Sequence, residues 1–136
     1  MKTFRLSLIC FALVSFSICF SSCSKKDNHD NDLTGQATYV LDDDANTTLV
    51  ASGTLVKGSV SDESVTVDVG INAVSTGAWE MSTAFVDGVS FYGKGVLNTT
   101  GIQKIRLHAK GTPTKSGFIT LTLDGGTHFI VNVTAE

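Results

Sequence analysis

Apolar and polar residues alternate along most of the chain after residue 34. A period of two places successive side chains on opposite faces of a β-strand, so each apolar set faces a core and each polar set faces solvent. No stretch of eleven residues shows a convincing helical period. The pattern therefore predicts an all-β domain. Its clearest apolar sets are Val65, Val67, Val69 and Ile71; Ile105, Leu107 and Ala109; Ile119, Leu121 and Leu123; and Phe129, Val131 and Val133.

Clusters of Gly, Asp, Asn, Ser and Pro separate the alternating stretches and mark turns. The terminal Asp124-Gly125-Gly126 predicts a hairpin, because glycine supplies the positive φ that tight hairpin turns need. Short strands at this spacing are typical of an antiparallel β-sandwich of about seven to eight strands. The predicted strands cover residues 36–41, 49–57, 64–72, 77–84, 89–97, 102–110, 117–123 and 127–134.

About 100 residues can enclose one hydrophobic core between two sheets. Trp79 alternates with Glu80 and is interpreted as a core anchor, with an exposed functional Trp as the alternative. Strict alternation also puts one of Phe91 and Tyr92 on the outside, which makes Tyr92 a candidate stacking surface for a sugar. The predicted core consists of Val40, Leu55, Val65, Val67, Val69, Ile71, Trp79, Met81, Phe85, Val89, Phe91, Ile105, Leu107, Phe118 or Ile119, Leu121, Phe129, Val131 and Val133.

The N-terminus has the pattern of a signal peptide over residues 1–22. Lys2 and Arg5 form a positive segment, and the apolar run that follows is too short for a comfortable membrane span. All three cysteines (Cys10, Cys19 and Cys23) lie in this N-terminal part, so the later domain can hold no disulfide and no thiolate metal site.

The tetrapeptide Phe20-Ser21-Ser22-Cys23 resembles the lipobox of bacterial lipoproteins. In that family the cysteine becomes the first residue after cleavage and carries the lipid. The resemblance therefore implies that Cys23 is lipidated and anchors the protein to the outer membrane. The alternative is an ordinary secretory signal with a cysteine near its cleavage site, which would leave a free thiol in an oxidising compartment.

Residues 23–33 are predicted to be the lipidated cysteine and a flexible polar tether, because residues 24–32 include no apolar side chain to bury. The acidic residues Asp27, Asp30 and Asp32 resemble the surface-export signals of Bacteroidota lipoproteins, which implies a cell-surface location; a periplasmic one is the alternative. His29 lies among them, and we interpret this tract as a spacer rather than a metal site.

The segment from Gly77 to Val133 resembles an immunoglobulin-like β-sandwich module of secreted and lipid-anchored Bacteroidota proteins, where it is often found in tandem. The resemblance rests on Gly77-Ala78-Trp79, on Val86 to Phe91, on Thr100 to Ile105 and on Gly111-Thr112-Pro113. It implies an immunoglobulin-like domain over residues 34–136. It implies no catalytic residue.

The charge pattern is uneven. Without Lys2 and Arg5 the chain has 8 basic against 13 acidic side chains, a formal charge of −5, which argues against a nucleic-acid binder. Lys104, Arg106, His108 and Lys110 nevertheless share one face of a predicted strand. With Tyr92 they form a candidate binding surface for an acidic glycan or partner. The favoured alternative is an edge strand whose lysines prevent sheet-to-sheet association.

Other candidate sites are weaker, and we predict no enzyme activity, no metal and no cofactor. His108 and His128 would need a third ligand to bind a metal ion. Asp42-Asp43-Asp44 is better explained as a solvated turn than as a calcium site. Asp68 and Glu80 are polar-face carboxylates that nothing brings together across a cleft.

The sequence favours a lipid-anchored envelope protein with a non-catalytic binding or adhesion module, whose contacts lie on the loops 42–48, 85–88 and 111–117. The alternative is a structural or accessory subunit of an outer-membrane complex, for example in nutrient uptake, pairing through an edge strand at 34–41 or 127–134. A small hydrolase ranks third. Ligand, partner and oligomeric state stay open.

Overall fold

The computed structural model describes residues 35–136, which form eight β-strands and no helix. The all-β prediction is confirmed, and each predicted strand corresponds to an observed one. The strands are β1 (Tyr39–Leu41), β2 (Leu49–Val56), β3 (Thr66–Ala73), β4 (Gly77–Ser82), β5 (Val89–Leu97), β6 (Gly101–Gly111), β7 (Gly117–Thr122) and β8 (His128–Thr134).

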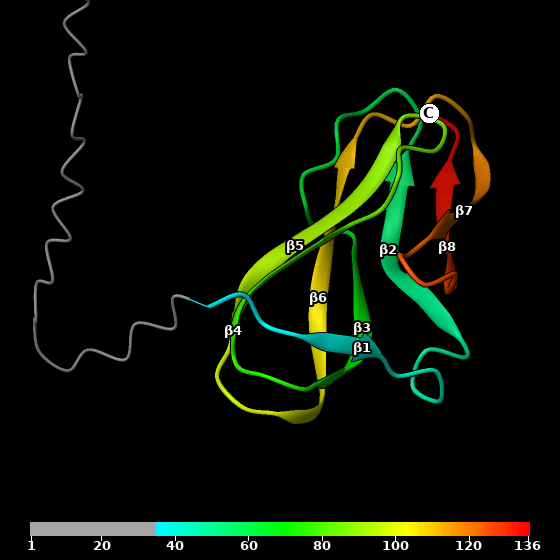
Figure 1. Ribbon diagram of the computed structural model, residues 1–136. Helices are drawn as coiled ribbons and strands as arrows, with labels where there is room; N and C mark the ends of the chain where they lie inside the picture. The colour runs from blue at the N-terminus through cyan, green and yellow to red at the C-terminus, as the bar shows by residue number, and fades with distance from the viewer. Residues whose placement is uncertain (1–34) are drawn as a thin grey trace, which may run out of the picture. The chain divides into compact units, whose positions relative to one another are not determined.

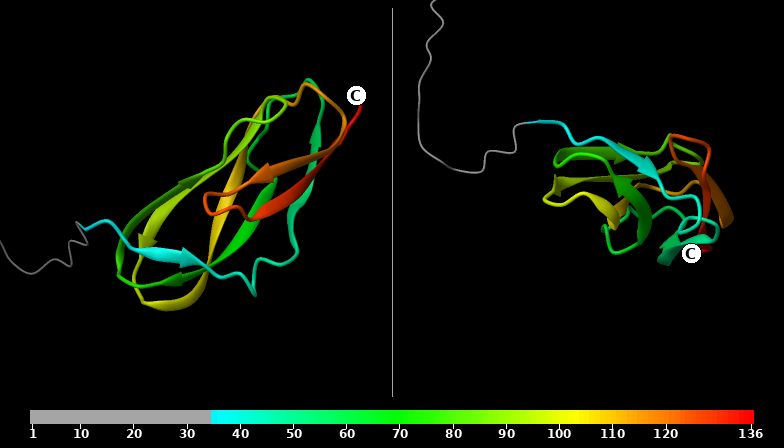
Figure 2. Two further views of the ribbon diagram at one scale, coloured as in Figure 1. Left: turned by 45° about the vertical axis from the view of Figure 1, so that its right-hand side comes forward. Right: turned by 60° about the horizontal axis from the view of Figure 1, so that its bottom comes forward.

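The strands form one curled sheet in the order β4-β5-β6-β3-β2-β8-β7, with β1 paired to β3 (Figures 1 and 2). The sheet is mixed, because β2 and β8 run parallel while the other pairs are antiparallel. The observed architecture is thus a half-barrel, and it does not divide clearly into the two sheets of a sandwich.

Strand β2 joins the two halves of the curl. It pairs with β3 at Ser52 and Thr66, and with β8 on its other side. Its register against β8 shifts between Val50 and Thr54, and Gly53 within that interval has a φ of 97°. A bulge of this kind bends a strand and increases its twist, which carries one sheet around the core.

The core fills the concave side of the curl, as the alternation predicts. Phe91 of β5 and Phe129 of β8 meet there edge to face, with ring centroids 5.0 Å apart, so the two halves of the sheet contact each other. Trp79 is buried, and its register partner on β5 is Gly95. A Cβ atom at Gly95 would lie 2.9 Å from the indole Nε1, so glycine makes room for the ring. The interpretation of Trp79 as a core anchor is confirmed.

Two predicted core residues are wrong. Val40 is 55% exposed, because Tyr39 and Leu41 are the β1 residues that pack against the core. Phe85 is 66% exposed, because β4 ends at Ser82 and the alternation stops there. The choice between Phe118 and Ile119 is settled in favour of Ile119, since Phe118 points to solvent.

The two edges of the sheet differ. The β4 edge is partly covered, because Ala78 exchanges backbone hydrogen bonds with Gly35 and Ala37. The β7 edge has no further neighbour among the described strands. The prediction of a free edge at 127–134 is wrong, since β8 lies between β2 and β7. The other predicted edge, at 34–41, includes β1, which pairs with β3 and with no other described strand.

Candidate functional site

The predicted binding residues share the outer face of β5 and β6, which are neighbouring strands. Tyr92 lies directly across from His108, and both are half-buried. Lys110 pairs with Ser90, and Lys104 lies opposite Gly70 of β3. We call this surface the basic face; it consists of Tyr92, Lys94, Lys104, Arg106, His108 and Lys110.

The edge-strand explanation of these cations is wrong. β6 is an interior strand that pairs with β5 on one side and β3 on the other. β3 pairs with β6 from Gly101 to His108, and β5 pairs with it from His108 to Gly111. β6 is therefore not the outermost strand of the sheet, which is the position where lysines oppose pairing with another sheet. The basic face therefore needs another explanation.

Arg106 is held by its cross-strand neighbour Asp68. The guanidinium Nε lies 2.6 Å from one carboxylate oxygen and Nη2 lies 2.9 Å from the other, a bidentate pair. These hydrogen bonds lower the pKa of Asp68 and raise that of Arg106. Within residues 35–136, Lys94, Lys104 and Lys110 form no ion pair. Lys94 lies directly opposite Glu80 of β4, so Lys104 and Lys110 are the lysines of this face that have no carboxylate as register partner and are available to an incoming anion.

His108 is oriented by the chain before β3. Its Nδ1 lies 2.9 Å from the carbonyl oxygen of Glu63. Since a carbonyl only accepts, Nδ1 carries the proton of this hydrogen bond, and Nε2 has no partner among the described residues. The neutral ring therefore presents Nε2 as an acceptor.

A shallow hollow of about 260 Å³ joins these groups. Glu63 and Lys94 belong to it but were missed by the sequence analysis. Glu63 lies in the turn before β3, and Lys94 lies on β5 rather than on the strand that carries the cationic stripe. Both become neighbours of His108 only through strand pairing. The hollow is lined by Glu63, Tyr92, Gly93, Lys94, His108, Ala109 and Lys110.

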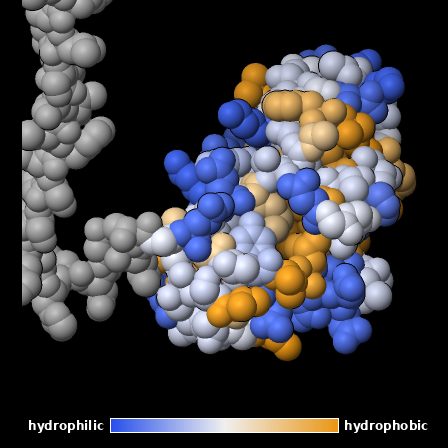
Figure 3. All heavy atoms as spheres, viewed as in Figure 1, coloured by the Kyte–Doolittle hydropathy of each residue, from blue (hydrophilic) through white to orange (hydrophobic). Residues whose placement is uncertain are grey.

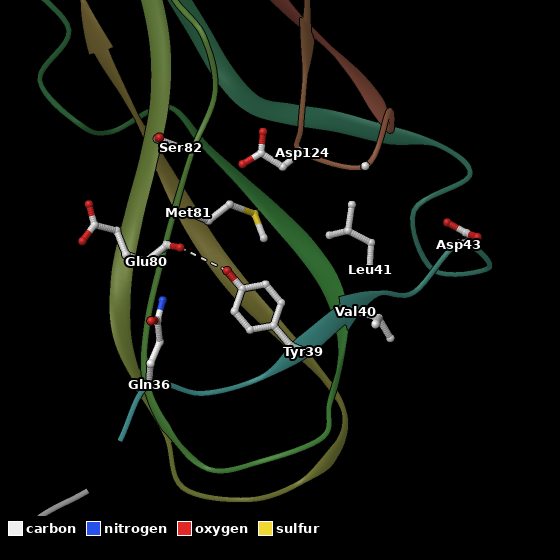
Figure 4. Close-up of a pocket in the computed structure, with 10 residues that line it drawn as sticks. Gln36, Tyr39, Val40, Leu41, Asp43, Glu80, Met81, Ser82 and Asp124 are labelled. Atoms are coloured by element: carbon white, nitrogen blue, oxygen red, sulfur yellow. Dashed lines mark hydrogen bonds between the residues drawn. The ribbon is translucent and has the colours of Figure 1, made fainter. Parts of the chain in front are cut away.

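A larger hollow of about 670 Å³ lies between β1, β4 and the turn that joins β7 to β8 (Figure 4). The Tyr39 hydroxyl donates a 3.0 Å hydrogen bond to the Glu80 carbonyl across it. Burial, and then the charge of Asp124, raises the pKa of Tyr39. Figure 3, which has the same orientation as Figure 1, shows apolar surface near the middle of the domain with hydrophilic groups around it.

This larger hollow has carboxylates at its rim but no chemistry that we can assign. Asp43, Glu80 and Asp124 line it beside Leu41 and Met81. Among the described residues no group of three His, Cys, Asp or Glu side chains is placed to hold a metal ion. Sequence reasoning missed the hollow because its lining comes from three separate parts of the chain.

The other sequence candidates do not converge. Asp68 and Glu80 are separated by β5 and β6, about 14 Å along the sheet, which is too far for a glycosidase pair. His108 and His128 are separated by β3 and β2. The segment from Asp42 to Asn46 is a turn, as predicted.

The three predicted recognition loops lie at two ends of the domain. Loops 85–88 and 111–117 contact each other, through the hydrogen bond from Thr112 to Gly88 and the ion pair between Lys115 and Asp87. Loop 42–48 lies at the other end of the sheet (Figure 1). A single recognition site built from all three loops is therefore ruled out by their placement.

Some predictions fall on residues that the structure does not describe. Cys23, the signal peptide over 1–22 and the whole tether over 23–33 with its acidic residues lie outside residues 35–136. Among the described residues, no helix is long and apolar enough to cross a membrane. The chain matches no protein-family model, and no curated protein or solved structure is detectably similar to it.

Proposed function

We propose that this chain is a lipid-anchored protein of the bacterial outer membrane, and that residues 35–136 act as a non-catalytic binding or adhesion module. Cys23 after Phe20-Ser21-Ser22 supports the anchor. The immunoglobulin-like sandwich is part of the proposal, and the contact of Phe91 with Phe129 between the two halves of the sheet supports it.

The observation that carries the binding role is the basic face. An interior strand carries lysines that no described residue pairs, beside a half-buried tyrosine and an oriented histidine. None of these side chains belongs to the buried core, and the two lysines of β6 form no ion pair among residues 35–136. We therefore assign ligand contact to this face, with an envelope glycan or envelope protein as the ligand.

Two experiments test the lipid anchor and the cellular location separately. Metabolic labelling with a palmitate analogue should label the wild-type chain and not a Cys23→Ala variant. Protease treatment of intact cells should remove the domain if it faces outside. Protection from protease together with labelling would place the module in the periplasm and contradict the adhesion role, while absence of label would contradict the anchor.

The accessory-subunit function is a second candidate, and the free edge of β7 favours it. β7 pairs only with β8, and its six residues include no charged side chain and no proline. Such an edge can accept an extended segment of a partner. Cross-linking in intact cells from a photoreactive residue at Thr120 should then capture a defined envelope protein, whereas a matched residue at Asn132, an exposed position of β8 that is paired on both sides, should not.

A further inference from the structure

We infer that the basic face binds a linear acidic polysaccharide, which extends the proposed function by naming the class of ligand and the residues that contact it. The inference rests on the proposed binding role of this face. It is carried by the hollow that joins Tyr92 to His108 and by the lysines on either side of it.

Charge is segregated on the domain. Residues 35–136 contain 6 basic and 10 acidic side chains, yet four of the basic ones lie on the outer face of β5 and β6. Two carboxylates share this face, because Asp68 lies opposite Arg106 and Glu80 lies opposite Lys94, so the face carries a net excess of positive charge on an otherwise acidic domain. Such an excess attracts anions to that face. The four are Lys94, Lys104, Arg106 and Lys110.

The arrangement of the cations fits an elongated ligand. Lys104 and Lys110 are six residues apart on β6, which corresponds to about 20 Å along an extended strand. Arg106 lies between them and already forms an ion pair with Asp68. Separate cations along one line match repeated charges on a polymer better than they match a single small anion.

The groups between the cations suit a sugar. Tyr92 presents an aromatic ring that is half-buried and fixed on an interior strand, and an aromatic face packs against the apolar face of a sugar ring. Nε2 of His108, directly across from Tyr92, accepts a hydrogen bond from a hydroxyl when the ring is neutral. We therefore assign one sugar unit to the hollow beside Tyr92, with its acidic neighbours on Lys94 and Lys110.

A nucleic acid is also a linear polyanion, but the surface fits it less well. Only one aromatic side chain lies on the face, and the acidic Glu63 lines the same hollow. Single-strand binders instead combine a positively charged groove with several stacking aromatics. Nucleic acid is therefore the competing outcome of the test.

The test measures binding of the full chain, purified in detergent, to polygalacturonate by affinity electrophoresis and calorimetry. The methyl-esterified polymer has the same backbone without the charge and serves as the ligand control. Lys94→Gln with Lys110→Gln should weaken binding by about tenfold and flatten its salt dependence. The charge-matched control is Lys57→Gln with Lys115→Gln, which changes net charge equally but leaves the basic face intact.

The tyrosine is tested in the same assay. Tyr92→Ala should weaken binding by about tenfold, while Tyr92→Phe keeps the ring and should bind nearly as the wild type does. Thermal unfolding of each variant shows whether it is folded. If Tyr92→Ala does not fold, the two lysine double variants decide the matter.

The outcomes separate this inference from the proposed function. Loss of affinity in Lys94→Gln/Lys110→Gln but not in the control double variant supports the acidic polysaccharide. Equal binding of the esterified polymer, equal loss in both double variants or tighter binding of single-stranded DNA would overturn it. Failure with every acidic polymer together with binding to a neutral glycan or an envelope protein would overturn only the ligand class and leave the binding module standing.

Discussion

The side-chain amide of Asn46 hydrogen-bonds to both backbone polar groups of Gly70. Its Nδ2 donates to the Gly70 carbonyl and its Oδ1 accepts from the Gly70 amide, each at 2.8 Å. On this side of β3, β1 pairs from Ile71 onward and β2 pairs at Thr66. Between these two points, the side-chain amide of Asn46 makes the hydrogen bonds that a neighbouring strand would otherwise make. Buried backbone groups need partners, and here a loop side chain supplies them.

Removing this amide should destabilise the domain. Asn46 is 4% exposed, so Asn46→Ala leaves the buried amide of Gly70 without a partner, while the Gly70 carbonyl keeps only its hydrogen bond from the Asp42 amide. We expect the free energy of unfolding to fall by about 1–3 kcal/mol, measured by urea denaturation. The control is Asp44→Ala, an exposed residue of the same loop. Equal stability of the two variants would show that the amide contributes nothing.

The glycine opposite Trp79 should be equally restrictive. In Gly95→Ala the new methyl group would lie 2.9 Å from the indole Nε1, so the ring must move. We expect a loss of about 1–3 kcal/mol and a shifted emission spectrum, which reports Trp79 alone because the chain has one tryptophan. Gly35→Ala is the control, since its added methyl group meets no atom within 4 Å. An unchanged spectrum in Gly95→Ala would contradict this packing.

The sequence predicted the strands well because alternation is a local property, and a period of two is visible in each strand separately. Trp79 and Phe129 were assigned to the core for this reason. Pairing between strands is not local. The sequence showed Tyr92 and His108 as separate polar-face residues, and only the antiparallel register of β5 with β6 makes them neighbours.

Edges and loops limited the prediction most. The alternation of apolar and polar residues is the same in a strand that pairs on one side and in a strand that pairs on both. The cationic stripe of β6 was therefore interpreted as an edge strand, although β6 lies between β5 and β3. Gly70 also lies within an alternating run, and nothing local shows that the loop residue Ala45 covers it. A Cβ atom at Gly70 would lie 2.6 Å from the Cβ of Ala45.

The ion pair between Asp68 and Arg106 should make stability depend on pH in the acidic range. Arg106 lowers the pKa of Asp68 in the folded state, so the pair stabilises the fold above the ordinary aspartate pKa of about 4. This contribution is lost as the pH falls through the lowered value, because the folded carboxylate then becomes protonated. Both side chains are exposed (60% for Arg106 and 43% for Asp68), so the effect should be small.

The measurement compares the wild type with Asp68→Asn by urea denaturation across the acidic range. The wild type should be slightly more stable near neutral pH, and the difference should vanish at strongly acidic pH. In an Arg106→Gln background the same substitution should give no pH-dependent difference. A difference that grows as the pH falls would have the wrong sign and would contradict the assignment.

The free edge of β7 should make the domain associate with itself at high concentration. Phe118 is 79% exposed on this strand, and Gly117 to Thr122 contains no charge to oppose pairing with another copy. Natural sheets block such edges with an inward or edge lysine, which is costly to bury between two sheets. Thr120→Lys should therefore reduce association measured by sedimentation velocity, without lowering stability, because Thr120 is exposed. Asn132→Lys places the same charge on an exposed position of β8 that is paired on both sides, and it should leave association unchanged. If both lysine variants reduce association equally, net charge and not the edge of β7 controls it.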